Sequence, residues 1–148
     1  MTAKEYRVRA VRCNHLADDE TVYQALRRAT DPLERSWDVL TRAKRITIKF
    51  NQAWAPERRV VMHGQSQELV SDKVARAVLR LLRERTKAEI TCIEISTGLR
   101  DPEQFDSFMT LLPVAREFDV PIIDGNKPPL GVYQVPGGGN MFKQYTLP

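Results

Sequence analysis

Two ionisable side chains interrupt segments of the sequence that otherwise show the apolar pattern of β-strands. Lys49 lies near the end of residues 45–51, and Glu94 lies near the end of residues 90–96. A charge within such a strand needs an opposite charge or access to solvent. If the two strands are neighbours, Lys49 and Glu94 form either a structural ion pair or a polar cluster with shifted pKa values. We take both as candidate catalytic residues, with Lys49 as the cation and Glu94 as the acid/base or the pairing partner.

Other polar residues near these strands suit the binding of a ligand. Asn51 shares a strand face with Lys49, because residues two apart in a strand point the same way. A short turn of small residues after residues 90–96 offers backbone N–H groups and hydroxyls, which suit phosphate or carboxylate groups. The plainer alternatives are a turn-forming asparagine and an exposed histidine with no role in binding. The candidate ligand-binding residues are Asn51, His63, Ser66, Ser96, Thr97 and Gly98.

The sequence holds no recognisable metal or cofactor motif. Its two cysteines, Cys13 and Cys92, form no closely spaced pair, whereas zinc and cluster sites gather several ligands on one small shell. We therefore expect no metal site, and no iron–sulfur cluster held by this chain itself. Neither a G-x-x-x-x-G-K-[ST] loop nor a G-x-G-x-x-G fingerprint occurs, so the sequence identifies no cofactor.

Strand and helix patterns alternate along the chain. Strand patterns occupy residues 6–12, 45–51, 90–96, 120–124 and 132–135. Helical patterns occupy residues 22–29, 33–43, 67–85 and 102–118, and Ser66 is the expected N-cap of the third helix. This alternation indicates βαβ units. We expect one Rossmann-like α/β domain over residues 1–148, with three α/β/α layers, a mainly parallel sheet of about four to five strands, and residues 45–51 as a central strand.

The charge pattern narrows the classes of partner. The chain has 148 residues and a net formal charge of +4, and its excess of Lys and Arg lies in the first half. No basic strand carries the aromatic residues that stack nucleic-acid bases, so we do not expect a nucleic-acid partner. No apolar run approaches the roughly 20 residues of a membrane span, and no secretory signal is visible. We expect a cytoplasmic protein with a small anionic ligand and no membrane contact.

The order of residues around Lys49 and Glu94 matches the pattern of a known family. Lys49 and Asn51 end one strand, Ser66 precedes a helix rich in Val and Leu, and Glu94-Ile95-Ser96 end the next strand. In these features the chain resembles domain of unknown function 362. That resemblance implies a redox-linked setting, because members are often fused to or encoded with ferredoxin-like iron–sulfur modules. Phe50 stands where the family has proline, and the family's further stretch rich in Lys, Asn and Gly is missing.

The resemblance and the residues lead to three hypotheses about function. The first is an anion- or cofactor-binding α/β domain of a redox-associated protein, which corresponds to the N-terminal part of a larger domain. The second is a non-enzymatic interaction module that completes its sheet with another chain, by self-association or with a ferredoxin-like partner. The third and weakest is a nucleic-acid binder that uses the Arg-rich first half. An enzyme and a binding module are both compatible with the sequence.

Overall fold

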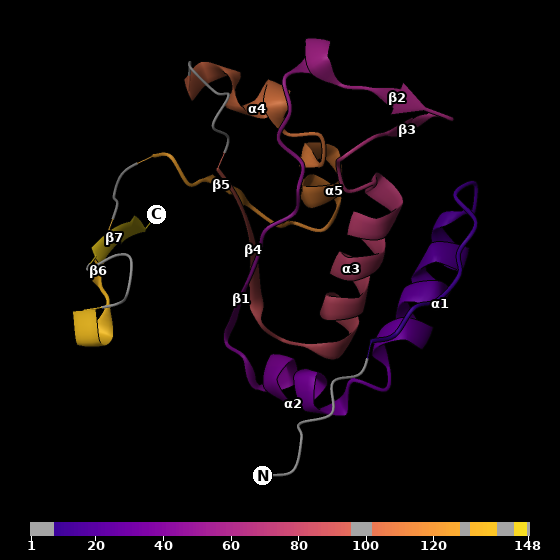
Figure 1. Ribbon diagram of the computed structural model, residues 1–148. Helices are drawn as coiled ribbons and strands as arrows, with labels where there is room; N and C mark the ends of the chain where they lie inside the picture. Colours follow the sequence, from indigo (N-terminus) through magenta and orange to yellow (C-terminus); the bar gives the residue numbers. More distant parts are fainter. Residues whose placement is uncertain (1–7, 96–101, 128–130, 139–143, 148) are drawn as a thin grey trace. The chain divides into compact units, whose positions relative to one another are not determined.

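The computed structural model describes residues 8–95, 102–127, 131–138 and 144–147. These residues form a mixed α/β fold (Figure 1). The chain divides into two compact units: Met1–Ile46 with Val70–Glu89, and Thr47–Leu69 with Ile90–Pro148. No helix among the described residues is long and apolar enough to cross a membrane.

The first unit contains three helices at the places that the sequence predicts. They are α1 (Asp19–Thr30), α2 (Glu34–Arg42) and α3 (Asp72–Arg85). The side chain of Asp18 accepts a hydrogen bond from the backbone N–H of Thr21 and so caps α1. The prediction that Ser66 caps α3 is wrong. Ser71 is the N-cap and accepts from the backbone N–H of Val74, because the helical geometry begins only at Asp72.

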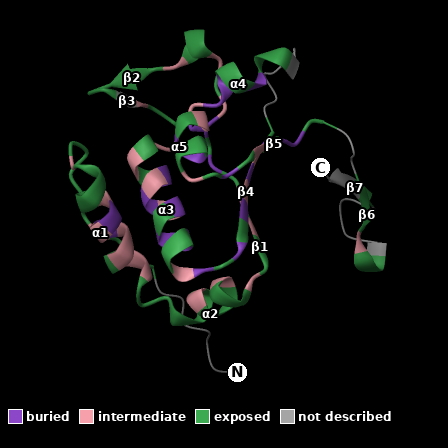
Figure 2. Cartoon of the chain, turned by 180° about the vertical axis from the view of Figure 1, so that it is seen from behind, coloured by how far each residue is buried: buried purple, intermediate pink, exposed green. Residues whose placement is uncertain are grey.

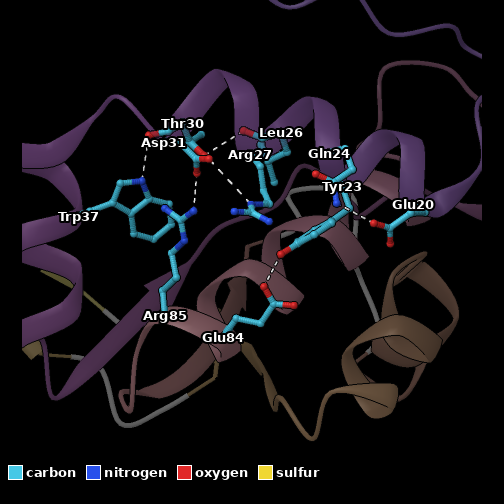
Figure 3. Close-up of polar contacts among 10 residues, drawn as sticks. All are labelled: Glu20, Tyr23, Gln24, Leu26, Arg27, Thr30, Asp31, Trp37, Glu84 and Arg85. Carbon is cyan, nitrogen blue, oxygen red and sulfur yellow. Dashed lines mark hydrogen bonds and ion pairs between the residues drawn. The ribbon is translucent and has the colours of Figure 1, made fainter.

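Helices α1 and α3 pack against each other through a buried tyrosine. Tyr23 is 3% exposed and contacts Ala77 and Leu81 of α3, while Trp37 of α2 packs against the same cluster. The Tyr23 hydroxyl donates a hydrogen bond to Glu84, which Figure 3 shows. The apolar stripes of the helices thus build the core of the first unit.

Ion pairs flank this core. Arg76 pairs with Asp19 at 3.3 Å, Arg80 with Glu20 at 2.6 Å, and Arg85 with Asp31. The Arg80 guanidinium also lies 3.8 Å from the centre of the Tyr23 ring. Arg76, Arg80 and Arg85 therefore join α3 to α1.

The second unit holds most of a three-stranded sheet. Its strands are β1 (Arg45–Ile48), β4 (Glu89–Glu94) and β5 (Ile122–Asp124), in the order β1-β4-β5. β4 and β5 are parallel, with Cys92 opposite Ile122 and Glu94 opposite Asp124. Within the described residues β4 is the central strand and β1 lies at an edge, so the expectation of a central strand at residues 45–51 is wrong. The sheet there has three strands rather than four or five.

The difference in strand number arises at the two ends of the chain. Of the strand predicted at residues 6–12, the first two residues lie outside the described structure; residues 8–12 form no regular structure, and Val8 is 95% exposed. Two small apolar residues between arginines bury too little surface to hold a strand there. The strand predicted at residues 132–135 exists as β6 (Gly131–Gln134), but it pairs antiparallel with β7 (Gln144–Leu147) in a separate two-stranded sheet.

Short elements complete the second unit. They are η1 (Pro56–Arg58), β2 (Val61–Met62), β3 (Gln65–Ser66), η2 (Pro102–Gln104), α4 (Phe105–Phe108), α5 (Leu112–Glu117) and η3 (Pro136–Gly138). Figure 2 shows buried residues along β4 and within α4 and α5. Phe105, Phe108 and Met109 form a core cluster against which Ile122 of β5 packs. This cluster therefore packs against the start of β5.

Candidate functional site

Lys49 and Glu94 form the ion pair that the sequence predicts. Lys49 directly follows β1, Glu94 ends β4, and the two strands are neighbours. The Lys49 Nζ lies 2.7 Å from Glu94 Oε1. The two side chains differ sharply in exposure, with 54% for Lys49 and 2% for Glu94. The carboxylate is therefore inside the protein, while much of the lysine faces solvent.

Backbone groups satisfy the buried carboxylate as well. The N–H of Ile95 donates to Glu94 Oε1 at 2.9 Å, and the N–H of Gln52 donates to Oε2 at 3.2 Å. Phe50 is 7% exposed and anchors the chain between Lys49 and Gln52. With an ammonium and two amides around it, Glu94 meets the requirement that a buried charge be paired and hydrogen-bonded.

Asp124 lies next to Glu94 and was not among the predicted site residues. It is opposite Glu94 in the register of β4 and β5 and is 8% exposed. Its Oδ1 accepts from the backbone N–H of Asn126 at 3.0 Å, and Lys127 Nζ lies 3.9 Å from its Oδ2. Asp124 ends an apolar strand as Glu94 does, so the same sequence signal could have found it.

A buried glutamine adjoins this cluster through its backbone. Gln52 is 0% exposed, and neither polar atom of its side-chain amide has a hydrogen-bond partner among the described residues. Its backbone carbonyl oxygen accepts from the Thr110 hydroxyl at 3.0 Å. An unsatisfied buried amide costs about 1–3 kcal/mol, so it is a feature that ordinary core packing does not favour.

Asn51 connects two loops in this structure. Its side-chain amide donates to the backbone carbonyl of Glu68, which has a positive φ of 63°. A non-glycine residue in that region is strained and needs support from its surroundings. The structure therefore gives Asn51 the role of holding the loop before α3.

Two of the remaining candidates lie in the hairpin of β2 and β3. His63 and Gly64 have φ values of 51° and 74° and form the turn between β2 and β3. Ser66 lies in β3, where it pairs with Val61 of β2. Positive φ at both turn residues is the geometry of a two-residue hairpin. His63 and Ser66 thus lie in a hairpin, while Ser96, Thr97 and Gly98 lie outside the described residues.

Metal ligands do not gather in the part of the chain that the structure describes. No group of three or more His, Cys, Asp or Glu side chains there could hold a metal ion. Cys13 is exposed, whereas Cys92 is 1% exposed on the same strand as Glu94. Burial raises the pKa of the Cys92 thiol to about 11, which disfavours the thiolate that binds metals.

Comparison with known proteins gives no relative for this chain. A scan of protein-family models, a search of curated proteins and a search of solved structures each find no match. The resemblance to domain of unknown function 362 stays a hypothesis from the residues, and the site has to be interpreted from its geometry.

Proposed function

We propose that this chain is an anion-binding α/β domain in which Lys49 contacts the ligand. The observation that carries the proposal is the contrast in exposure across the ion pair, 54% for Lys49 against 2% for Glu94. The Lys49 ammonium contacts Glu94 and the backbone carbonyl of Phe50 at 3.5 Å, and about half of its side chain is exposed, so in this proposal a third donor remains for a ligand. An ammonium has three donors and no acceptor, so it recognises anionic oxygen atoms.

Glu94 serves as a positioning residue in this proposal. Its contact with Lys49 restricts a side chain that otherwise has four flexible bonds, which lowers the entropy that ligand binding costs. Its own oxygens already accept from Ile95 and Gln52. A carboxylate enclosed in this way is suited to pairing, and we assign it that role rather than acid/base chemistry.

The position of Lys49 in the sheet supports the proposal. Ligands of open parallel sheets bind outside the carboxyl ends of the strands, and Lys49, Glu94 and Asp124 all lie at those ends. We extend the proposal to a Rossmann-like architecture with further strands and to a redox-associated setting, as the family resemblance implies. An anionic cofactor is one ligand that such a site would accept.

A titration with simple anions tests the proposal. Acetate and phosphate are added at constant ionic strength while backbone amide signals are followed by NMR. We expect saturable shifts for Ile95 and Gln52, whose N–H groups hold Glu94. Lys49→Met should abolish them. Lys87→Met removes the same charge from an exposed lysine in the first unit and should leave them unchanged.

The opposite pattern would reject the proposal. Shifts that rise linearly without saturation, or that persist in Lys49→Met, would show that the lysine is not an anion site. Equal losses in Lys49→Met and Lys87→Met would show a general effect of charge. In either case the Lys49–Glu94 pair is a structural contact.

A second candidate function follows from the edges of the sheet. Among the described residues β1 and β5 each have a neighbour on one side only, and Ile123 of β5 is 49% exposed. Open edges and exposed apolar residues favour pairing with another chain. If the chain is an interaction module, sedimentation should show assembly as concentration rises. A strictly monomeric chain over a wide range of concentrations would exclude self-association.

A further inference from the structure

The ion pair of Lys49 has a counterpart on the next strand. Lys127 Nζ lies 3.9 Å from Asp124 Oδ2, as Lys49 Nζ lies 2.7 Å from Glu94 Oε1. Glu94 and Asp124 are opposite each other in parallel register, so their Cα atoms lie about 5 Å apart and their side chains leave the same face of the sheet. Two lysines are thereby tied to adjacent positions at the carboxyl ends of β4 and β5.

We propose that Lys49 and Lys127 together bind a dianionic phosphoryl group. This inference rests on the proposed anion site and names the class of ligand that the site takes. A phosphoryl group offers three acceptor oxygens, so it can accept from two ammonium groups at once. Its double charge is attracted by both lysines, whereas a monoanion gains only half of that Coulomb energy.

The second pair repeats the contrast in exposure that marks the first. Lys127 is 53% exposed and Asp124 is 6% exposed. Asp124 also accepts from the backbone N–H of Asn126, just as Glu94 accepts from backbone amides. In each pair the carboxylate side chain is almost fully buried, while about half of the lysine side chain is exposed. We expect an anion that approaches from solvent to meet the exposed parts of the two lysines before the buried carboxylates.

The looser geometry of the second pair leaves Lys127 able to reach a ligand. A separation of 3.9 Å is longer than a charge-assisted hydrogen bond, and the flexible lysine stem can turn from Asp124 toward an anion. The ammonium also lies 5.8 Å from the centre of the buried Phe105 ring, a contact that limits how far the side chain moves.

Affinities for three probes test this inference. Inorganic phosphate, glycerol phosphate and acetate are titrated at constant ionic strength into the wild-type chain, Lys49→Met, Lys127→Met and the control Lys87→Met. We expect phosphate to bind roughly tenfold more tightly than acetate, and Lys127→Met to remove most of that preference. Lys127→Arg should retain it. If glycerol phosphate binds more tightly than inorganic phosphate, the ligand class is an organic phosphate.

The outcomes separate this inference from the proposed anion site. If phosphate binding needs Lys49 but is unchanged in Lys127→Met, the anion site stands and the two-lysine model is wrong. Equal affinity for acetate and phosphate also overturns it. If no probe binds through Lys49, both proposals fail. Circular dichroism of Lys127→Met and Lys127→Arg shows whether each variant is folded, so that a loss of binding is assigned to the contact.

Discussion

At the residue scale, the central feature is a buried carboxylate that depends on a partly exposed lysine. Breaking a buried pair costs about 3–5 kcal/mol, whereas an exposed pair contributes about 0–1 kcal/mol. Lys49 and Glu94 combine the two cases, since only the carboxylate is enclosed. Water can approach the lysine side of the pair, but the two backbone donors on Glu94 remain in place.

We therefore expect Lys49→Met to lower the free energy of unfolding by about 1–3 kcal/mol, between these two limits. Glu94→Gln should cost a similar amount. The double variant should lose less than the sum of both, because each single change already removes the contact. Urea unfolding measures all three. Lys127→Met is the matched control and should cost about 0–1 kcal/mol, because its pair is longer. If the losses of stability in the two single variants sum to the loss in the double variant, Lys49 and Glu94 do not interact.

At the scale of the elements, the start of α3 shows how local signals compete. Ser66 and Ser71 both precede the apolar stripe of this helix, and both are suitable N-cap residues. The structure places Ser66 in β3, opposite Val61, and leaves Ser71 to cap the helix. Ser66 belongs to the hairpin because β2 and β3 pair across the turn at His63 and Gly64.

A pair of serine substitutions checks this assignment. Ser71→Ala should lower the free energy of unfolding by about 0.5–2 kcal/mol, because the Val74 N–H loses its side-chain acceptor. Ser66→Ala is the matched control and should change stability by less than about 0.5 kcal/mol. Thermal or urea unfolding of both variants gives the comparison. A larger effect at Ser66 than at Ser71 would contradict the helix start described here.

The contact of α1 with α3 predicts a dependence on pH. The hydrogen bond from Tyr23, and then that from Arg80, holds the pKa of Glu84 below its ordinary value of 4.5. Because this pKa is lower in the folded state, the contact stabilises the fold above that value and is lost as pH falls through the folded pKa. Burial, and then the hydrogen bond to Glu84, raises the pKa of Tyr23 above 10.0.

Tyr23→Phe should therefore destabilise the chain by about 0.5–1.5 kcal/mol at neutral pH. The difference in the free energy of unfolding between Tyr23→Phe and the wild type should shrink as pH falls below the ordinary pKa of Glu84, because the wild-type contact also weakens there. Unfolding curves over a range of acidic pH measure this difference. Tyr133→Phe is the control for the same chemical change at a tyrosine that is 42% exposed. A deficit that is constant with pH would disprove the coupling to Glu84.

At the scale of the whole molecule, the two compact units each carry one cysteine, and these differ in exposure. Cys13 belongs to the first unit and is exposed, while Cys92 belongs to the second and is 1% exposed. Burial raises the pKa of Cys92 to about 11, so it has little thiolate at neutral pH. Its reaction with a thiol reagent consequently requires the second unit to open.

Thiol labelling of the native chain should show two separate phases. Cys13 should react fast, and Cys92 should react slowly at a rate that rises with denaturant as the core opens. Cys13→Ser should remove the fast phase and leave the slow one. Mass spectrometry of quenched samples measures both rates. Fast labelling of Cys92 in the absence of denaturant would mean that β4 is not buried as described.

The sequence by itself determined the elements whose apolar residues recur at a helical or strand period. The spacing of apolar residues located α1, α2 and α3, and the alternation around Ile46 and Ile90 located β1 and β4. It also indicated that Lys49 and Glu94 would pair, because two charges in apolar strands need each other. Helical and strand periods are local properties of the chain, so they can be recognised before any packing is known.

Only the tertiary structure decided which distant residues meet. It placed Asp124 beside Glu94, turned Asn51 toward Glu68, and made β4 rather than β1 the central strand of the described sheet. It also left Val8 exposed although its segment has a strand-like pattern. Strand order, register and loop contacts depend on side chains that are far apart in the chain. Their free energy comes from burial and pairing, which no local pattern contains.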